Sequence, residues 1–423
     1  MEHPATDLPD SLRRNQILQT AADLIATTGL RTSLQDIASA AGILPGSLYH
    51  HFESKETILV ELLRRYHAEL DRIAQKTLAR LDDPDPAPAF DRIAALGTAI
   101  AQCAVENRAA LQMSFYEGPS AKPELVSLAQ QRPTAILDAM QQTLRTARWS
   151  GYLRTDVDLA VLADRICQSM LHVGLDVVRH NTDAQRVATL LCRILLEGIA
   201  GRRLTDAELD SSPAFRAADV LVQGWTAETE DSPEKQDKAA YIRAVARSEF
   251  GRRGYEGTTV RDIAAAAGLG TGTVYRLIGS KEELLMSIMQ SFGEKVAQGW
   301  TDVLASDSTA VQKIDALSWI NTNALARFGD EFRIQLAWMR QSPPDIQDPG
   351  WLFTTRVRQM KTLLREGIKA GDVSIDSPSN EMLARCVIAA GWIPENILAE
   401  LGVRPGQLLV RDTLLRGVTT AAG

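Results

Sequence analysis

The sequence has few cysteines and few aromatic residues. Its four cysteines are far apart and form no C-x-x-C pair: Cys103, Cys167, Cys192 and Cys386. That spacing excludes a zinc finger and a disulfide framework, and it predicts reduced thiols. Aromatic residues make up 5% of the chain. Ala, Leu, Arg, Glu and Gln are common, so the composition favours helix.

Export and membrane signals are also missing. The opening MEHPATDLPDSL has neither the basic nor the apolar region of a signal peptide. No apolar run approaches the length of a membrane span. We therefore expect a cytoplasmic protein with no membrane partner. With 423 residues, 45% of them hydrophobic and 23% charged, the chain is long enough for roughly two to four globular domains.

Catalytic motifs are absent from the sequence as well. It contains no G-x-S-x-G, Walker A or H-E-x-x-H pattern. The stretch GLGTGTVY, from Gly268, lacks the third glycine of G-x-G-x-x-G and follows an Ala-rich helix instead of a strand, so it does not predict a nucleotide site. All six histidines lie in the first half, although a duplicated enzyme would be expected to keep its base. We expect no enzyme activity, cofactor or metal.

Charge is unevenly distributed along the chain. The net charge of −7 argues against nucleic-acid binding if it is taken over the whole molecule. Residues 11–67, however, carry six Lys/Arg against five Asp/Glu, and residues 235–295 carry ten against seven. Contact with phosphates depends on the local face, so these two segments remain compatible with DNA binding.

The same two segments contain an internal repeat. Residues 36–59 (DIASAAGILPGSLYHHFESKETIL) align without gaps with residues 262–285 (DIAAAAGLGTGTVYRLIGSKEELL), at an offset of 226. Upstream, Gly29 aligns with Gly254 at an offset of 225. The period is about half the chain, which indicates duplication of a whole unit and not a solenoid.

Each copy predicts the same run of helices. An amphipathic helix (residues 12–28 in the first copy) ends at a glycine. A short helix follows a capping box with Asp at its last position, and a third begins after a glycine turn; this is the helix-turn-helix pattern. A fourth helix follows an N-cap serine. The residues that carry these signals are Gly29, Ser33, Asp36, Gly42, Pro45 and Ser54, and Gly254, Thr259, Asp262, Gly268, Thr271 and Ser280.

Amphipathic helices fill the remainder, and no segment shows sustained alternation with a period of two. We expect an all-α fold with further helices at 68–82, 90–107, 123–149, 157–178, 184–202, 310–328, 331–341, 351–370, 379–392 and 404–420. Residues 205–236 are acidic and contain Ser and Pro, which is typical of a linker. A short helix is expected within it, at 217–225.

Several residues of the third and fourth helices suit contact with DNA. Hydroxyl-bearing side chains and the arginine among them can reach phosphates or base edges. Lys55 and Lys281 each begin a helix, where the macrodipole disfavours a cation. A lysine beside helix N-terminal N–H groups suits an anion such as phosphate. The alternative for either lysine is a solvated side chain without a partner.

Residues 27–59 and 252–285 resemble the DNA-binding domain of TetR/AcrR-type bacterial repressors. The resemblance implies operator DNA as a partner, a variable helical ligand-binding domain and no cofactor. The second copy departs from the pattern, because Leu277-Ile278 and Gly279 replace His51-Phe52 and Glu53. Carried over position by position, the implied DNA contacts are Ser33, Pro45, Gly46, Ser47, Tyr49, His50 and Lys55, and Thr259, Thr271, Gly272, Thr273, Tyr275, Arg276 and Lys281.

The sequence thus predicts two tandem TetR-like units. The helix-turn-helix domains are expected at 11–55 and 237–281, the helical ligand-binding domains at 56–204 and 282–423, and a linker at 205–236. The resemblance also implies that helices near the end of each unit form a dimer bundle. Within one chain this would give an intramolecular pseudo-dimer, and further self-association stays open.

A repressor released by a small hydrophobic effector is the expected function. The alternative is a small-molecule sensor or interaction scaffold whose second DNA-binding domain is degenerate. Bulky side chains of the helical domains are candidates for the effector pocket, although ordinary core packing would select the same residues. These candidates are Met113, Tyr116, Met140, Trp149, His172, Trp319, Trp338, Met339, Trp351 and Phe353.

Overall fold

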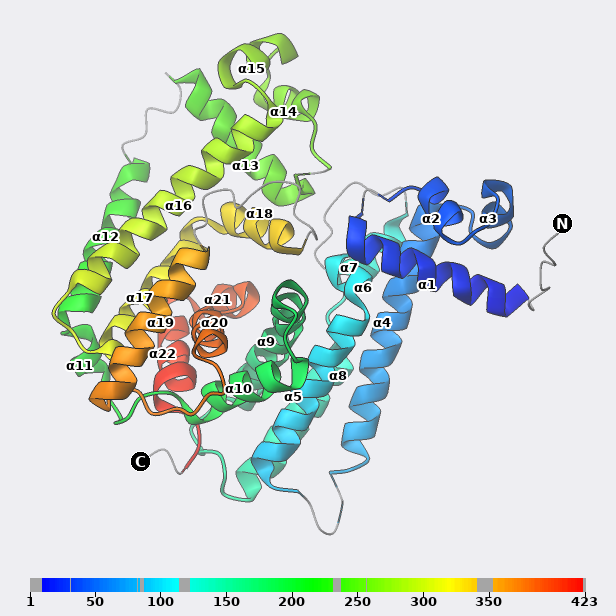
Figure 1. Ribbon diagram of the computed structural model, residues 1–423. Helices are drawn as coiled ribbons and strands as arrows, with labels where there is room; N and C mark the ends of the chain where they lie inside the picture. The colour runs from blue at the N-terminus through cyan, green and yellow to red at the C-terminus, as the bar shows by residue number, and fades with distance from the viewer. Residues whose placement is uncertain are drawn as a thin grey trace.

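The computed structural model describes residues 10–30, 32–81, 83, 87–113, 122–230, 237–255, 257–340 and 353–420. Within these ranges the fold is all-α, as predicted, and the only β-type pairings are two isolated bridges. The helices described in the first half are (Figure 1) α1 (Asp10–Thr28), α2 (Leu34–Ala40), α3 (Pro45–His51), α4 (Lys55–Leu78), α5 (Ala89–Glu106), α6 (Arg108–Met113), α7 (Pro123–Gln130), α8 (Thr134–Trp149), α9 (Leu159–His180) and α10 (Ala184–Glu197).

The second half repeats this order. It consists of α13 (Lys238–Arg253), α14 (Val260–Ala267), α15 (Thr271–Ile278), α16 (Lys281–Ala305), α17 (Ala310–Arg327), α18 (Gly329–Arg340), α19 (Phe353–Ala370), α20 (Asn380–Ala390), α21 (Glu395–Leu401), α22 (Val403–Val410) and the π-helical turn η1 (Arg411–Arg416). In both halves one helix of medium length and two short helices precede a long helix that leads into a bundle (Figure 1).

The predicted linker is largely helical. It contains α11 (Asp206–Asp210) and the 18-residue α12 (Pro213–Glu230), which packs against α16 and α17. The prediction of a short helix at 217–225 therefore underestimated the length of this helix. Phe215, Ala218, Val222 and Trp225 are buried at helical spacing, so this segment belongs to the second half and does not behave as a free connection.

Two other predicted helices are divided. The stretch 123–149 is broken between α7 and α8, because Pro133 supplies no backbone N–H and disfavours helical backbone at the residue before it. The stretch 404–420 ends at η1, where Gly417 has a positive φ of 74°. The helix α21 was not predicted. The N-caps expected at Ser54 and Ser280 are present.

An ionic cluster around the buried Arg411 ties α11 to the second half. The side chain of Arg411 is fully buried and donates two hydrogen bonds of 2.9 Å to the equally buried Asp315 of α17. It also reaches Asp206 at 3.0 Å and Asp210 at 2.6 Å. Burial raises the pKa of the Asp315 carboxyl, and the hydrogen bonds from Arg411 act against that rise.

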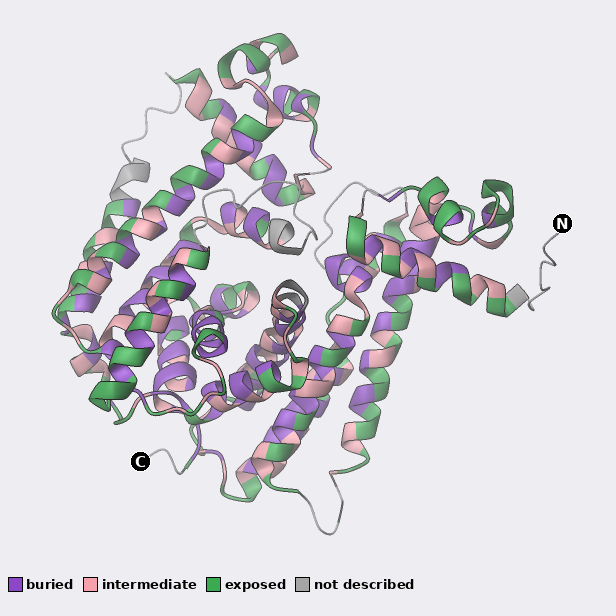
Figure 2. Cartoon of the chain, viewed as in Figure 1, coloured by how far each residue is buried: buried purple, intermediate pink, exposed green. Residues whose placement is uncertain are grey.

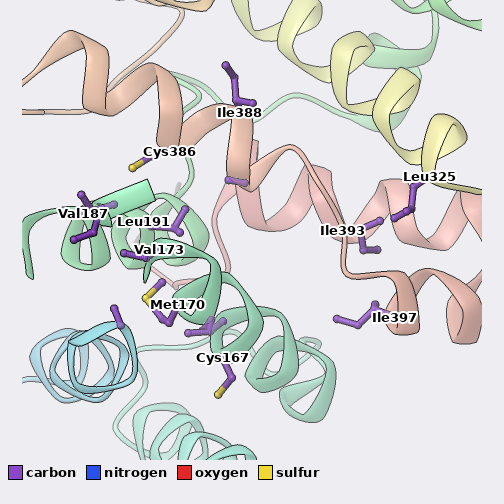
Figure 3. Close-up of a cluster of buried hydrophobic side chains, with 14 of the residues drawn as sticks. Cys167, Met170, Val173, Val187, Leu191, Leu325, Cys386, Ile388, Ile393 and Ile397 are labelled. Carbon is purple, nitrogen blue, oxygen red and sulfur yellow. The ribbon is translucent and has the colours of Figure 1, made fainter. Parts of the chain in front are cut away.

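The two halves pack through helices near the end of each. Helix α10 contacts both α20 and η1. Figure 3 shows Val187 and Leu191 of α10 beside Cys386 of α20, within a cluster of buried apolar side chains drawn from both halves. Arg165 of α9 is fully buried and donates to the carbonyls of Ala390 (2.6 Å) and Trp392 (3.2 Å).

Side chains of the second half also donate hydrogen bonds to the first half. Arg385 of α20 donates to Asp176 of α9 at 2.9 Å, and the amide of Asn396 donates to Asp164 at 2.7 Å. The interface between the halves therefore combines an apolar centre with hydrogen bonds whose partners lie more than 200 residues apart.

The backbones of the two halves meet at a pair of glycines. Gly198 follows α10 with φ 75°, and Gly417 follows η1 with φ 74°. A Cβ on Gly198 would lie 2.4 Å from the Leu415 carbonyl oxygen, and one on Gly417 would lie 2.3 Å from that of Glu197. Nearby amides bond reciprocally: Ile199 N–H to the Leu415 carbonyl at 3.2 Å and Val418 N–H to the Leu196 carbonyl at 2.7 Å.

One described stretch, Asn380–Leu401, is long and apolar enough to cross a membrane by length and composition alone, but 67% of its apolar 18-residue window is buried inside the molecule. It covers α20 and α21, which pack against α19, α10 and α22. This burial is typical of a core helix in a water-soluble fold.

Candidate DNA-binding heads

Two helix-turn-helix modules stand out from the bundle: head 1 (α1–α3, residues 10–51) and head 2 (α13–α15, residues 238–278). Both lie in the upper part of Figure 1 and are separated from each other in that view. In head 1, Ile37 of α2 and Leu48 of α3 are fully buried with Ile17 and Ile25 of α1. This small core fixes the angle between the two short helices.

The capping boxes predicted in both heads are present. In head 1 the Asp36 N–H donates to the Ser33 hydroxyl oxygen at 3.1 Å, and the Ser33 N–H donates to the Asp36 carboxylate at 2.8 Å. Thr259 and Asp262 repeat this at 3.2 and 2.8 Å. Hydrogen bonds from Ser33 lower the pKa of the Asp36 carboxyl. Ser33 and Thr259, both proposed DNA contacts, therefore also hold the start of α2 and α14.

The helix α3 presents its predicted contact residues to solvent. It begins at Pro45 and buries only Leu48. Figure 2 shows α3 and α15 with mostly exposed outer faces. Tyr49 is 56% exposed although it is a large aromatic residue, so it does not serve the core of the head. The remaining contact candidates of α3 are also exposed: Pro45, Gly46, Ser47 and His50.

The helix α15 has the same arrangement with different chemistry. Val274 is its buried residue, and Tyr275 is 53% exposed. Gly272 and Arg276 are exposed, while Thr271 and Thr273 are half-buried. Leu277 is 39% exposed, and Ile278 is only half-buried where Phe52 of head 1 is buried. The predicted residues of α3 and α15 are therefore exposed or half-buried, and head 2 has the weaker apolar anchor.

The two lysines at equivalent positions of the repeat, Lys55 and Lys281, have partners in the heads. The Lys55 ammonium donates to the Leu30 carbonyl, just after α1. The Lys281 ammonium donates to the carbonyls of Tyr255 (2.8 Å) and Thr258 (3.0 Å) and lies 4.0 Å from the centre of the Tyr255 ring. Burial lowers the pKa of Lys55. The solvated alternative is wrong, because both side chains tie the fourth helix to the loop after the first.

Two features of head 1 were not predicted from the sequence. Arg14 of α1 makes a bidentate pair with Glu61 of α4, at 2.6 Å for each hydrogen bond, and lies over the Phe52 ring. Leu44, at the N-cap of α3, is 75% exposed. A bidentate pair between α1 and α4 has no sequence signal, since its members are 47 residues apart.

Each head is attached to its bundle through matching helices. In head 1, α1 contacts α4 and α6, and in head 2, α13 contacts α16 and α18. Arg247 of α13 donates to the buried Glu331 of α18 at 3.3 Å. The helices α6 and α18 also contact each other, so the attachments of the two heads meet across the halves.

The candidate pocket residues whose side chains the structure describes lie on five helices: α6, α8, α9, α17 and α19. Met113 and Met140 are buried, and the ring Nδ1 of His172 lies 2.8 Å from the Gln168 carbonyl. Trp149 is 76% exposed at the end of α8. The Trp319 indole donates to Asp219 of α12 at 3.2 Å.

The other pocket candidates are placed as follows. The Phe353 ring stacks on His180, with centroids 6.4 Å apart. Trp338 and Met339 lie in α18, but their side chains are outside the described part of the molecule. Tyr116 and Trp351 lie outside the described residues. The effector pocket therefore stays a prediction.

Comparison with known proteins agrees with the helix-turn-helix geometry. The family of bacterial regulatory proteins of the tetR type matches residues 17–62 and 242–288. The HTH-type transcriptional repressor KstR2 of Rhodococcus jostii (strain RHA1) is 54% identical over 69 residues, which are 16% of this chain and 34% of that protein. KstR2 of Mycolicibacterium smegmatis is 50% identical over 64 residues, 15% and 31% of the two chains. The chain thus spans about a third of the length of these relatives.

Longer but weaker likenesses exist. The HTH-type transcriptional regulator UidR of Escherichia coli (strain K12) is 25% identical over 150 residues, 35% of this chain and 72% of that protein. The solved structure of the ketosteroid transcriptional regulator KstR2 of Mycobacterium tuberculosis matches 42% of this chain and 89% of its own, with 27% identity and a TM-score of 0.33.

Both matched segments run from the first helix of a head into the long helix that follows it, and the curated relatives are HTH-type regulators of transcription. The chain thus carries two copies of the tetR-family DNA-binding domain on one polypeptide.

Proposed function

We propose that this chain is a repressor in which the two halves form an intramolecular pseudo-dimer that holds two unlike heads on one asymmetric operator. The observation that carries this proposal is the reciprocal approach of Gly198 and Gly417. In a symmetric dimer, each contact occurs twice with the roles of the subunits exchanged. The paired glycines and their reciprocal amide bonds follow that rule within a single chain.

The side-chain contacts favour pairing between unlike halves. Arg165 donates to backbone carbonyls of the second half, whereas Arg385 donates to the Asp176 carboxylate of the first. Two copies of the second half would leave the buried Arg385 without the Asp176 carboxylate, and two copies of the first half could not form this pair either. Because an unpaired buried charge is costly, each half selects the other.

Unlike heads require unlike half-sites. Head 1 presents Pro45, Ser47 and His50, and head 2 presents Thr271, Thr273 and Arg276 in the matching places. Arginine binds guanine with two hydrogen bonds in the major groove, so we expect a guanine opposite Arg276. By analogy with dimeric helix-turn-helix proteins, the half-sites should lie roughly 34–36 Å apart, or about one helical turn.

The operator can be identified by selecting DNA from a random duplex library with the full chain, followed by footprinting. Analytical ultracentrifugation of the bound fragment then gives the stoichiometry. We expect an asymmetric site occupied by one chain. A perfect palindrome occupied by two chains, each protecting DNA only with head 1, would contradict the pseudo-dimer and support a degenerate second head.

A small lipophilic effector would release the repressor by favouring a form whose heads no longer match the operator spacing. The helical bundles, with buried adaptable side chains such as Met113 and Met140, are suited to such a ligand. A thermal-shift screen of steroid, fatty-acyl and aromatic compounds tests this, since a ligand at 100 times its Kd adds about 2.7 kcal/mol of stability. A hit should also weaken operator binding, and a screen without hits would count against an effector of this class.

A second candidate function is a sensor or scaffold in which head 2 no longer binds DNA. The exposed Leu277 and the half-buried Ile278 favour this alternative. Mobility shifts at several salt concentrations separate the two functions, because contacts with phosphates impose a steep salt dependence. If Tyr275→Ala leaves both affinity and salt dependence unchanged while Tyr49→Ala reduces them, head 2 is degenerate.

A further inference from the structure

We infer that Leu44 determines specificity in head 1 by making an apolar contact with the 5-methyl group of a thymine in the major groove. This inference rests on the proposed function, because it assigns a role to one residue of the DNA-binding face. The residue lies outside the contact positions implied by the family resemblance, and its exposure in the structure identified it.

Leu44 makes little contribution to the stability of the head. Its side chain is 75% exposed, more than that of any neighbouring large apolar residue in head 1, and is not among those that pack on the core. It occupies the N-cap of α3 and supplies no capping hydrogen bond. Leucine is a poor N-cap, and Ser, Thr, Asp or Asn at this place would stabilise the helix. Stability therefore gives no reason for leucine here.

The position of Leu44 does suit reading of a base. It immediately precedes Pro45, Gly46 and Ser47, which are exposed at the start of α3. In helix-turn-helix proteins the N-terminal residues of this helix contact base edges. The thymine methyl is the apolar group on the major-groove edges, and aliphatic side chains recognise it. An exposed leucine beside polar readers can remove that methyl from water, whereas it cannot hydrogen-bond a phosphate.

Head 2 provides a natural control at the same position. Its N-cap residue is Gly270, with φ −72° and ψ 141°, nearly the same backbone as Leu44 at −71° and 145°. A Cβ on Gly270 would meet no atom within 4 Å. The two heads thus differ in one apolar side chain on equivalent backbone, and a leucine can be exchanged between them without strain.

The test uses the operator that the full chain selects from random duplex DNA. Each thymine is replaced singly by deoxyuridine, which removes only the methyl group, and affinity is measured by fluorescence anisotropy. We expect one replacement in the head 1 half-site to weaken the wild type about fourfold, the factor for burial of one methyl group. The same replacement should leave the affinity of the Leu44→Gly variant for the operator unchanged. The Gly270→Leu variant should gain a comparable preference for thymine in the other half-site.

Several results would overturn the inference. In the first, removal of the methyl group from each thymine of the head 1 half-site leaves the affinity of the wild type unchanged. In the second, Leu44→Gly loses as much affinity as the wild type on the deoxyuridine operator. In the third, Leu44→Gly binds every DNA more weakly by the same factor. Thermal melting should be unchanged in Leu44→Gly, and Leu44→Met should keep the thymine preference, which separates readout from folding. Failure to select any DNA would instead overturn the proposed function, and the readout with it.

Discussion

Tyr49 and Tyr275 are the residues whose placement in the structure is hardest to explain by folding. Each is more than half exposed on the outer face of a short helix, beside a fully buried neighbour, Leu48 or Val274. An exposed aromatic side chain that keeps its hydroxyl in water is suited to contact a phosphate or a sugar. The repeat of this arrangement at equivalent positions favours a function shared by both heads.

We expect Tyr49→Ala to weaken operator binding about tenfold, with no change in Tm beyond a degree or so, because the side chain contributes little to the core. Tyr275→Ala should do the same if head 2 binds DNA. Fluorescence anisotropy and thermal melting provide the two measurements. The Leu48→Ala variant is the control, since a cavity in the head should lower the Tm as well. Wild-type affinity in both tyrosine variants would refute the assigned contact face.

Lys55 is expected to have two roles that can be separated. Its ammonium group bonds the Leu30 carbonyl, and it retains further N–H donors that can reach a phosphate. Lys55→Ala should therefore destabilise head 1 by about 1–2 kcal/mol and reduce the slope of log affinity against log salt by about one unit. Urea unfolding and binding at two salt concentrations measure these effects.

A matched variant divides the two effects. Lys55→Gln removes the charge but keeps an N–H donor for the Leu30 carbonyl, so it should retain more of the stability and lose the same unit of salt slope. An unchanged slope in both variants would show that Lys55 serves only the fold of the head.

At the scale of secondary-structure elements, the linker helices α11 and α12 depend on the cluster around Arg411. Asp315 of α17 is fully buried, and Arg411 is its partner. Arg411→Met would leave this carboxylate without its guanidinium and should cost about 3–5 kcal/mol. Asp315→Asn in the same background should recover part of the loss. Equilibrium urea unfolding of the three proteins checks this order of stability.

The loss of stability expected in Arg411→Met should change with pH in a definite direction. Because burial raises the folded-state pKa of Asp315 above its unfolded value, this carboxyl lowers stability as the pH rises from the unfolded towards the folded pKa. The rise in the pKa of Asp315 should be larger in Arg411→Met. The difference in unfolding free energy between this variant and the wild type should therefore shrink as the pH falls from 7 to 5. A difference that grows on acidification would contradict a buried, uncompensated carboxylate.

At the scale of the whole molecule, the glycine seam between the halves is open to a direct test. Gly417→Ala should destabilise the protein by more than the usual cost of alanine at a positive φ, because the new Cβ would lie 2.3 Å from the Glu197 carbonyl oxygen. It should also weaken operator binding, since the spacing of the heads depends on how the halves meet. Thermal melting and anisotropy provide the measurements.

Gly402 offers a matched control for this substitution. It has a similar backbone, with φ 83°, and a Cβ there would meet no atom within 4 Å. The loss of stability in Gly402→Ala should therefore measure only the strain of alanine at a positive φ. Equal destabilisation by the two variants would mean that the close approach of the halves contributes nothing to stability.

Local structure in the heads could be predicted from the sequence almost to the residue. The capping boxes at Ser33 and Thr259 and the proline at the start of α3 act within one helical turn. Their effect depends only on residues three or four positions apart, so the helix starts, the duplicated heads and the candidate contact face followed from the sequence, as did the family that they resemble.

The tertiary structure alone decided where long-range partners meet. It assigned α12 to the second half, gave Lys55 a carbonyl 25 residues away, and brought Gly417 onto Glu197 across the seam. Each of these contacts joins segments whose separation along the chain has no periodicity to reveal it. A buried polar group or a close backbone approach is selected by its surroundings in space, and a linear pattern contains no information about which distant segment will supply them.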